Sequence, residues 1–103
     1  MRVELHSEAQ SDLRAAALWY DEQNPGLGDE FIGAVAQVIK RIGSAPASFP
    51  VWPGTEGGPS IIRRALVDIF PYAVGFEVHP EHVLVLAIPH TRRRPLEWLR
   101  LAF

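Results

Sequence analysis

The sequence predicts an α+β fold in which helices cover one face of a small β-sheet. Apolar residues recur at helical spacing across residues 7–42, alternate with polar residues across residues 72–79, and run without interruption across residues 83–88. We expect an N-terminal strand, an antiparallel helical hairpin, a three-stranded antiparallel meander and a short C-terminal helix. These elements would form a single domain over residues 1–103, a length suited to one core.

Residues 2–6 alternate polar and apolar side chains, as a half-buried strand does, with Val3 and Leu5 facing inward. Ser7 and Gln10 have the capping-box arrangement, so a helix is expected to begin at Ser7. The buried stripe of this helix is widened by Trp19 and comprises Ala9, Leu13, Ala16, Ala17 and Tyr20. Its acidic residues are assigned to the solvated side: Glu8, Asp12, Asp21 and Glu22.

Residues 24–28 predict a turn, because Pro25 disfavours a helical conformation in Asn24 and the two glycines permit positive φ. A second helix follows, and it has the strongest periodic pattern in the chain, formed by Phe31, Ala34, Val35, Val38, Ile39 and Ile42. Acidic residues in its first turn and basic residues in its last turn match the helix dipole, and Gly43 is expected to end it. The two helices would form an antiparallel hairpin.

Residues 44–60 are rich in proline and glycine and predict a long irregular connection. A loop of this length in a compact domain usually has a functional use or is disordered. Phe49, Val51 and Trp52 indicate that its first part packs on the core.

Three strands are expected at residues 61–69, 72–79 and 83–88, with turns at residues 70–71 and 79–82. The alternation in the second strand indicates a sheet with one covered face. The continuously apolar third strand is expected to be central. Pro95 suits the first turn of the terminal helix, in which Trp98 would act as an apolar anchor.

The composition, 48% hydrophobic and 21% charged residues, describes an ordinary folded protein. The formal net charge of -2 does not support non-specific binding of nucleic acid through overall charge. The charge is uneven, because residues 1–30 contain seven acids and two bases, whereas residues 61–103 contain six arginines and four acids. One basic side is therefore expected.

The absence of cysteine excludes disulfides and thiolate chemistry. The N-terminus lacks the apolar stretch of a signal peptide, and no apolar run reaches membrane-spanning length. We therefore expect a cytoplasmic protein.

Three consecutive arginines, Arg92, Arg93 and Arg94, directly follow the last predicted strand. Because the guanidinium fork suits phosphates and carboxylates, clustering three of them indicates an anionic partner or a functional surface. The alternatives are a solvated turn, or ion pairs with the acidic helical hairpin.

Arg63 and Arg64 are adjacent in a strand, so at most one of them faces a given surface, and one is expected to pair with an acid such as Glu77. His79 and His82 flank a tight turn, but two histidines without further nearby ligands do not predict a metal site.

Six segments, in order, form a pattern that covers nearly the whole chain. They are residues 9–13 leading to Trp19-Tyr20, residues 24–28 before Phe31, residues 62–65, residues 70–77, residues 85–95, and Trp98. This pattern resembles the RelE/ParE superfamily of toxins from type II toxin–antitoxin systems, and it is closer to the ParE branch. The resemblance implies the same compact α+β fold.

The superfamily divides by chemistry. RelE-like members cut messenger RNA on the ribosome, whereas ParE-like members inhibit DNA gyrase. For a nuclease, the resemblance implies His90 as the acid or base, and Arg92 or Arg93 as the cation that stabilises the charge on the reacting phosphate.

Three differences from the nucleases favour the ParE branch. Residues 53–60 contain Glu56 and no cation where the nucleases have basic residues, and Ala73 aligns with one of their arginines. Trp98 stands where many of them have a C-terminal tyrosine, and an indole N–H cannot exchange protons near neutral pH.

The resemblance therefore implies a growth-inhibiting toxin that acts on DNA gyrase without a cofactor or metal. Its expected partner is a cognate antitoxin, ParD-like or similar, which folds on binding and lays apolar and acidic side chains across the sheet and the helical hairpin. The alternatives are a ribosome-dependent mRNA endoribonuclease and an inactive scaffold that only binds its partner. The residues expected to contact target or antitoxin are Arg63, Arg64, Arg92, Arg93, Arg94, Trp98 and Arg100.

Overall fold

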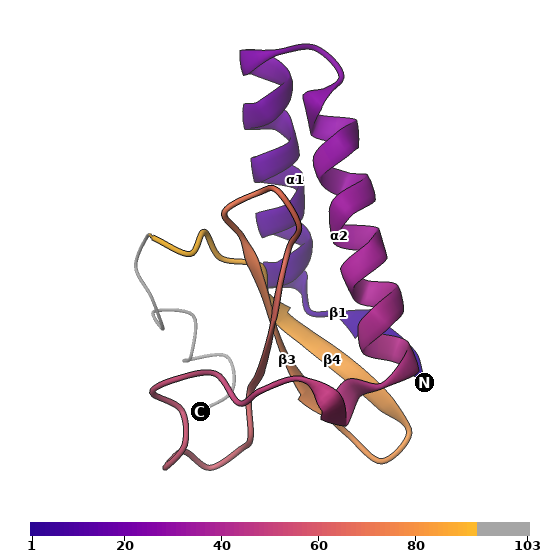
Figure 1. Ribbon diagram of the computed structural model, residues 1–103, viewed down its shortest axis with the longest axis vertical. Coiled ribbons are helices and arrows are strands. Elements are labelled where there is room, and N and C mark those ends of the chain that lie inside the picture. The colour runs from indigo at the N-terminus through magenta and orange to yellow at the C-terminus, as the bar shows by residue number, and fades with distance from the viewer. Residues whose placement is uncertain (93–103) are drawn as a thin grey trace.

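The computed structural model describes residues 1–92, so the predicted C-terminal helix lies outside the described residues. Two long helices stand side by side as an antiparallel hairpin and pack against a four-stranded sheet (Figure 1). The elements in chain order are β1 (Arg2–Leu5), α1 (Ser7–Gln23), α2 (Leu27–Ser44), the short 3-10 helix η1 (Pro46–Ser48), β2 (Arg63–Leu66), β3 (Ala73–Val78) and β4 (His82–Ala87). The predicted α+β order is confirmed over these residues.

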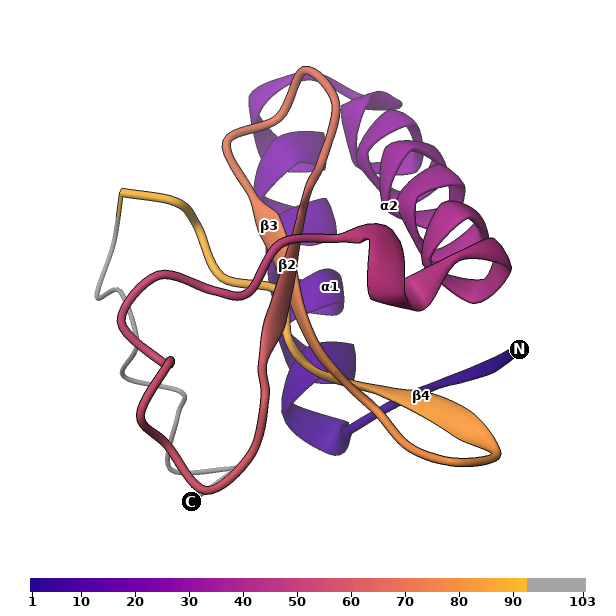
Figure 2. The same cartoon turned by 60° about the horizontal axis from the view of Figure 1, so that its bottom comes forward.

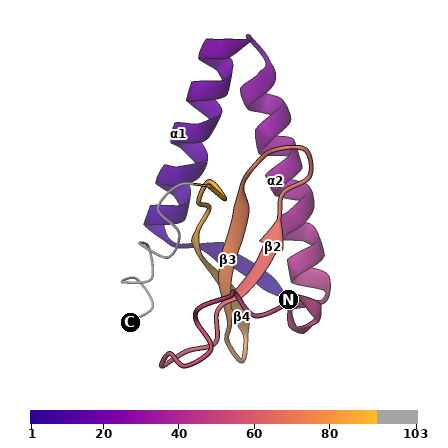
Figure 3. The same cartoon turned by 60° about the vertical axis from the view of Figure 1, so that its left-hand side comes forward.

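The strands lie in the order β1-β4-β3-β2. β2, β3 and β4 form the expected antiparallel meander, whereas β1 pairs with β4 in parallel. β4 is therefore an interior strand, as its unbroken apolar sequence predicts. Figure 3 shows β2, β3 and β4 in front of the helical pair.

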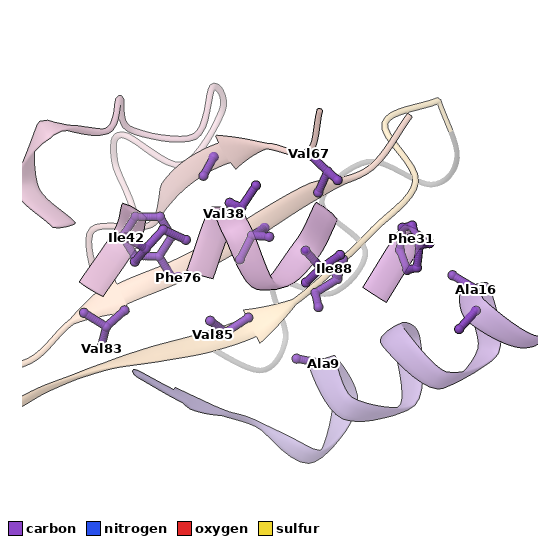
Figure 4. Close-up of a cluster of buried hydrophobic side chains, with 14 of the residues drawn as sticks. Ala9, Ala16, Phe31, Val38, Ile42, Val67, Phe76, Val83, Val85 and Ile88 are labelled. Atoms are coloured by element: carbon purple, nitrogen blue, oxygen red, sulfur yellow. The ribbon is translucent and has the colours of Figure 1, made fainter. Parts of the chain in front are cut away.

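The main core lies between the helices and one face of the sheet (Figure 4). α2 buries the residues that its periodicity predicts, Phe31, Val35, Val38 and Ile42, while Ala34 and Ile39 are partly buried. They pack against Val83 and Val85 of β4, and Phe76 and Val74 of β3. At the far end of the hairpin, the rings of Tyr20, Phe31 and Phe70 lie edge to face or tilted, 5.0 to 5.4 Å apart.

The opposite face of the sheet is also covered, which corrects the expectation of a single covered face. Residues 49–62 form a long loop between η1 and β2 (Figure 2). Trp52 in this loop packs with Ile62, Ala73, Leu86 and Ala87 in a second buried cluster. β3 is apolar on both faces because the helices cover one face of the sheet and the loop over residues 49–62 covers the other.

The structure differs from the prediction at one end of each long helix. The N-cap of α1 is His6 rather than Ser7, because His6 Nδ1 accepts the Glu8 N–H at 3.1 Å, while Gln10 Nε2 donates to the Leu5 carbonyl. Gly43 does not end α2, which continues to Ser44. A Cβ on Gly43 would lie 3.0 Å from the Met1 carbonyl oxygen, so this glycine allows the N-terminal strand to approach closely.

Within the part of the chain that the structure describes, no helix is both long and apolar enough to cross a membrane.

Candidate functional site

The two arginines of β2 contact different groups. Arg63 Nη1 donates to the Phe49 carbonyl oxygen at 2.7 Å, and so ties β2 to the preceding loop. Arg64 lies over the ring of Trp52, with its guanidinium carbon 5.9 Å from the ring centroid. Both side chains are partly exposed and keep further N–H donors for a partner.

The expected ion pair between one of these arginines and Glu77 is wrong. Glu77 Oε1 instead contacts His79 Nε2 at 3.2 Å, two residues along the same strand end. The rings of His79 and His82 are stacked 4.9 Å apart, and His82 Nε2 lies 3.5 Å from Glu4 Oε2. Within residues 1–92, no group of three or more potential ligands is placed to hold a metal ion.

His90 and Arg92 lie after β4, beside the start of β3. His90 Nδ1 accepts the backbone N–H of Arg92 at 3.1 Å, and its ring stands edge-on to Tyr72 at 5.1 Å. The Thr91 N–H donates to the Pro71 carbonyl at 2.8 Å, which holds this segment to the β2–β3 connection. The other candidates, Arg93, Arg94, Trp98 and Arg100, lie outside the described residues.

The structure therefore places the three described candidate arginines in two groups. Arg63 and Arg64 occupy the edge strand β2, while Arg92 follows β4, and β3 separates the two strands. No ion pair or hydrogen bond between described residues joins the two groups.

The structure describes two positions at which the sequence resemblance implies a difference from the nucleases. Ala73, at which the resemblance implies an arginine in the nucleases, is fully buried in the cluster that contains Trp52. In the loop before β2, Glu56 Oε2 accepts the Gly54 N–H at 2.9 Å. Neither position supplies the cation that cleavage at a phosphate requires.

Asp12 is a residue that sequence reasoning missed. Helical periodicity assigns it to the solvated side of α1, but its Oδ2 accepts the Ile88 N–H at 2.9 Å and so ties α1 to the end of β4. Burial raises the pKa of Asp12 above its ordinary 3.8, an increase that the Ile88 hydrogen bond opposes and the nearby Glu8 carboxylate reinforces. Its place beside Leu13, at the border of the apolar stripe, is the signal that the sequence offers.

A pocket of about 510 Å³ opens next to Asp12. Its wall is formed by α1, by residues 71–72 just before β3, and by residues 88–90 after β4. The rings of Trp19, Tyr20, Tyr72 and His90 line it. One hollow therefore combines a carboxylate with aromatic rings.

Comparisons with known proteins place the fold and the family. The chain superposes on a solved structure described as the chromosomal ParDE TA system from P. aeruginosa with a TM-score of 0.75, at 16% sequence identity, covering 89% of this chain and 97% of that one. A search of curated proteins gave no match. The family model described as the ParE toxin of the type II toxin–antitoxin system parDE matches residues 3–95. The chain therefore belongs to the ParE toxin family of type II toxin–antitoxin systems.

Proposed function

We propose that this ParE-family toxin arrests growth in the cytoplasm by inhibiting DNA gyrase, and that a cognate antitoxin, ParD-like or similar, neutralises it. The family supports a toxin with a dedicated partner. Gyrase is proposed because ParE-like members of the superfamily act on it. RNA cleavage, the alternative activity, would need cations at two positions that hold Ala73 and Glu56 here.

The observation that carries this choice is the burial of Ala73 in the same cluster as Trp52. An mRNA nuclease of this superfamily needs cations around the reacting phosphate on this part of the sheet. Here position 73 is a fully buried alanine that supplies no cation, and Glu56 adds a negative charge to the loop. A protein inhibitor of gyrase requires a binding surface rather than this constellation.

The edge of β2 is a suitable surface for the antitoxin. Residues 50–52 pair with only the first half of this edge, through the Trp52 N–H to Ile62 carbonyl bond and the Arg64 N–H to Pro50 carbonyl bond. Beyond Arg64, the side chain of Leu66 is 56% exposed. A segment with apolar and acidic side chains would cover Leu66 and pair with Arg64, and it would order as it binds. The proposed contacts on the remaining surface are Arg63, Arg92, Arg93, Arg94, Trp98 and Arg100.

The target is tested with purified gyrase and with translation extracts in parallel. Toxin purified from its antitoxin is expected to trap gyrase–DNA cleavage complexes and to leave messenger RNA intact. The double substitution Arg92→Ala, Arg93→Ala should weaken trapping, whereas the double substitution Lys40→Ala, Arg41→Ala at two exposed positions of α2 serves as a matched loss of two charges outside the proposed contact residues. Expression of the toxin alone should arrest growth, and co-expression of the antitoxin should restore it. Harmless expression at high level would contradict the toxin proposal, and intact gyrase activity would contradict the target.

The runner-up, a ribosome-dependent endoribonuclease, is supported by the contact between His90 and Arg92. Because His90 Nδ1 accepts the Arg92 N–H, the neutral imidazole holds its proton on Nε2, where it could act as an acid or base. Codon-specific cuts in translated messenger RNA that disappear in His90→Ala would establish this activity.

A further inference from the structure

A second pocket lies at the end of the sheet where the pairing of β2 with β3 stops. The last paired residues there are Arg63 and Phe76. The pocket has a volume of about 380 Å³, and its wall contains Ala47 of η1 together with Ser60, Ile61, Arg63, Glu77, Val78 and His79. It therefore combines a hydroxyl, a cation and two apolar side chains.

The Ser60 hydroxyl has no partner in this pocket. Its Oγ is buried and makes no hydrogen bond to any described residue. The hydroxyl of Ser48, by contrast, donates to the Ala45 carbonyl at 2.7 Å. Because a buried polar group without a partner destabilises the folded protein, a bound acceptor would recover part of that loss.

Arg63 is the cation of the pocket, and its guanidinium is held in place. Its Nη1 donates to the Phe49 carbonyl at 2.7 Å, while the other N–H groups remain as donors. Within residues 1–92, no carboxylate forms an ion pair with Arg63. Glu77 lines the same pocket, but its Oε1 contacts His79 Nε2 at 3.2 Å instead. The positive charge of Arg63 is therefore not neutralised within that part of the chain.

We propose that this pocket binds the carboxylate of an acidic antitoxin side chain, an inference that rests on the proposed toxin function for the source of that side chain. Arg63 donates to the carboxylate, and the Ser60 O–H supplies a second hydrogen bond. Ile61 is 62% exposed and Val78 is 40% exposed, so apolar antitoxin residues beside the acid cover them. A nucleic-acid phosphate is disfavoured, because it has no apolar neighbours to cover these two side chains.

The test is a titration of the full-length ¹⁵N-labelled chain with N-acetyl-glutamate α-amide, followed by amide chemical shifts. N-acetyl-glutamine α-amide is the neutral matched probe, and methyl phosphate represents a nucleic-acid backbone. We expect the glutamate probe to shift the Ile61 and Val78 amides with saturation, and the glutamine probe to shift neither. Equal shifts with both amino-acid probes, or tighter binding of methyl phosphate, would overturn the proposal.

Ser60→Ala should weaken binding of the glutamate probe about fivefold or more, because a hydrogen bond to a charged group is lost. The free variant should be at least as stable as wild type in urea unfolding, since this hydroxyl has no described partner to lose. Ser48→Ala is the matched control, which should lose stability and bind the probe as wild type does. Lower stability of Ser60→Ala with unchanged affinity would make the hydroxyl structural and would overturn the site.

The two charged side chains of the pocket should act in opposite directions. Arg63→Gln should abolish the saturable shifts, whereas Glu77→Gln should strengthen binding about twofold or more, because a repelling carboxylate is removed. Weaker binding of the glutamate probe in Glu77→Gln would contradict the proposal.

The antitoxin itself separates failure of the site from failure of the proposed function. Its dissociation constant should rise about fivefold or more in Ser60→Ala and stay at the wild-type value in Ser48→Ala. Equal dissociation constants for wild type and Ser60→Ala would overturn the site, whether or not the chain is toxic. A wild-type chain that is harmless yet binds the glutamate probe would contradict the toxin function and leave the carboxylate site in place.

Discussion

At the scale of single residues, two aspartates of α1 hold other segments in place. Asp12 accepts the Ile88 N–H across 76 positions of sequence, and Asp21 Oδ1 accepts the N–H groups of Gly26 and Gly28 at 3.1 and 2.8 Å. Asp21 therefore provides the side-chain cap at the start of α2, whose N-cap residue, Gly26, has no side chain of its own. Helical periodicity alone assigns both aspartates to solvent.

Asp12→Asn is predicted to stabilise the free protein near pH 7. Burial raises the pKa of Asp12, so the folded state binds this proton more tightly than the unfolded chain does. The resulting stability is fully present below the unfolded value of 3.8 and is lost as the pH rises through the folded pKa. Urea unfolding should show the Asp12→Asn variant as the more stable form near pH 7, and the difference from wild type should vanish near pH 3.

The control for this prediction is Asp29→Asn, at an exposed position in the first turn of α2. There the carboxylate interacts favourably with the helix dipole, so its neutralisation should cost about 0.3–1 kcal/mol near pH 7. If Asp12→Asn also lowered stability near pH 7, the hydrogen bond to Ile88 would outweigh desolvation.

Gly28→Ala is predicted to lower the free energy of unfolding by about 1–3 kcal/mol. A Cβ at this position would collide with the Ala17 carbonyl oxygen and the Asp21 carboxylate, so α1 and α2 would have to separate. Gly33→Ala is the matched control on the same helix, because its Cβ would meet nothing within 4 Å. It should stabilise the protein by about 0.5–1 kcal/mol. If Gly28→Ala and Gly33→Ala changed stability equally in thermal or urea unfolding, the close approach of α1 and α2 at Gly28 would be contradicted.

At the scale of elements, the loop over residues 49–62 acts as the cover of a sheet face. Trp52 anchors it, Thr55 Oγ1 donates to the Trp52 carbonyl at 2.7 Å, and Arg63 binds the Phe49 carbonyl. The β2–β3 connection, by contrast, contains a residue that is almost fully exposed. Ile69 there is 96% exposed at φ 74°, a conformation that is strained for a β-branched residue.

Trp52→Ala is predicted to cost about 3–5 kcal/mol, because it empties the second buried cluster and removes the ring beneath Arg64. Leu66→Ala, at an exposed position on the adjacent strand, should change stability by less than about 0.5 kcal/mol. Hydrogen exchange should rise first in β2 in the Trp52 variant. Stability equal to that of the Leu66 variant would show that the loop does not cover the sheet.

At the scale of the whole molecule, the unequal charge of the two ends of the sequence bears on association. The acidic residues gather in positions 1–30 and the arginines in positions 61–103, so an acidic antitoxin segment would be attracted to the arginines. Attraction of this kind acts on the encounter step and is screened by salt.

The association rate constant with the proposed antitoxin is predicted to fall about tenfold or more between about 0.02 and 0.5 M salt, with a smaller change in the dissociation rate. Stopped-flow mixing at several salt concentrations measures both. The double substitution Arg63→Gln, Arg64→Gln should flatten the salt dependence, whereas Lys40→Gln should not. An association rate that is independent of salt would exclude electrostatic steering.

Much of the fold was predictable because its determinants are local. The apolar period from Phe31 to Ile42 specifies the buried face of α2, and the apolar run of β4 specifies an interior strand. The family could also be recognised from the order of six short sequence segments along the chain. The predicted roles of Arg63, Arg64, His90 and Arg92 remain proposals, since their targets are not part of the chain.

By itself, the sequence determined the order of the elements, the buried stripe of α2 and the meander of the last strands, because contacts between residues a few positions apart decide these features. The stripe predicted for α1 is wrong at Trp19, which is 49% exposed, and at Asp12, which is partly buried. Tertiary structure alone decided the parallel pairing of β1 with β4, the burial of Trp52 and Ala73 in one cluster, and the hydrogen bond from Ile88 to Asp12. Each joins residues far apart in the chain, and periodicity along one element contains no information about which distant segment will supply its partner.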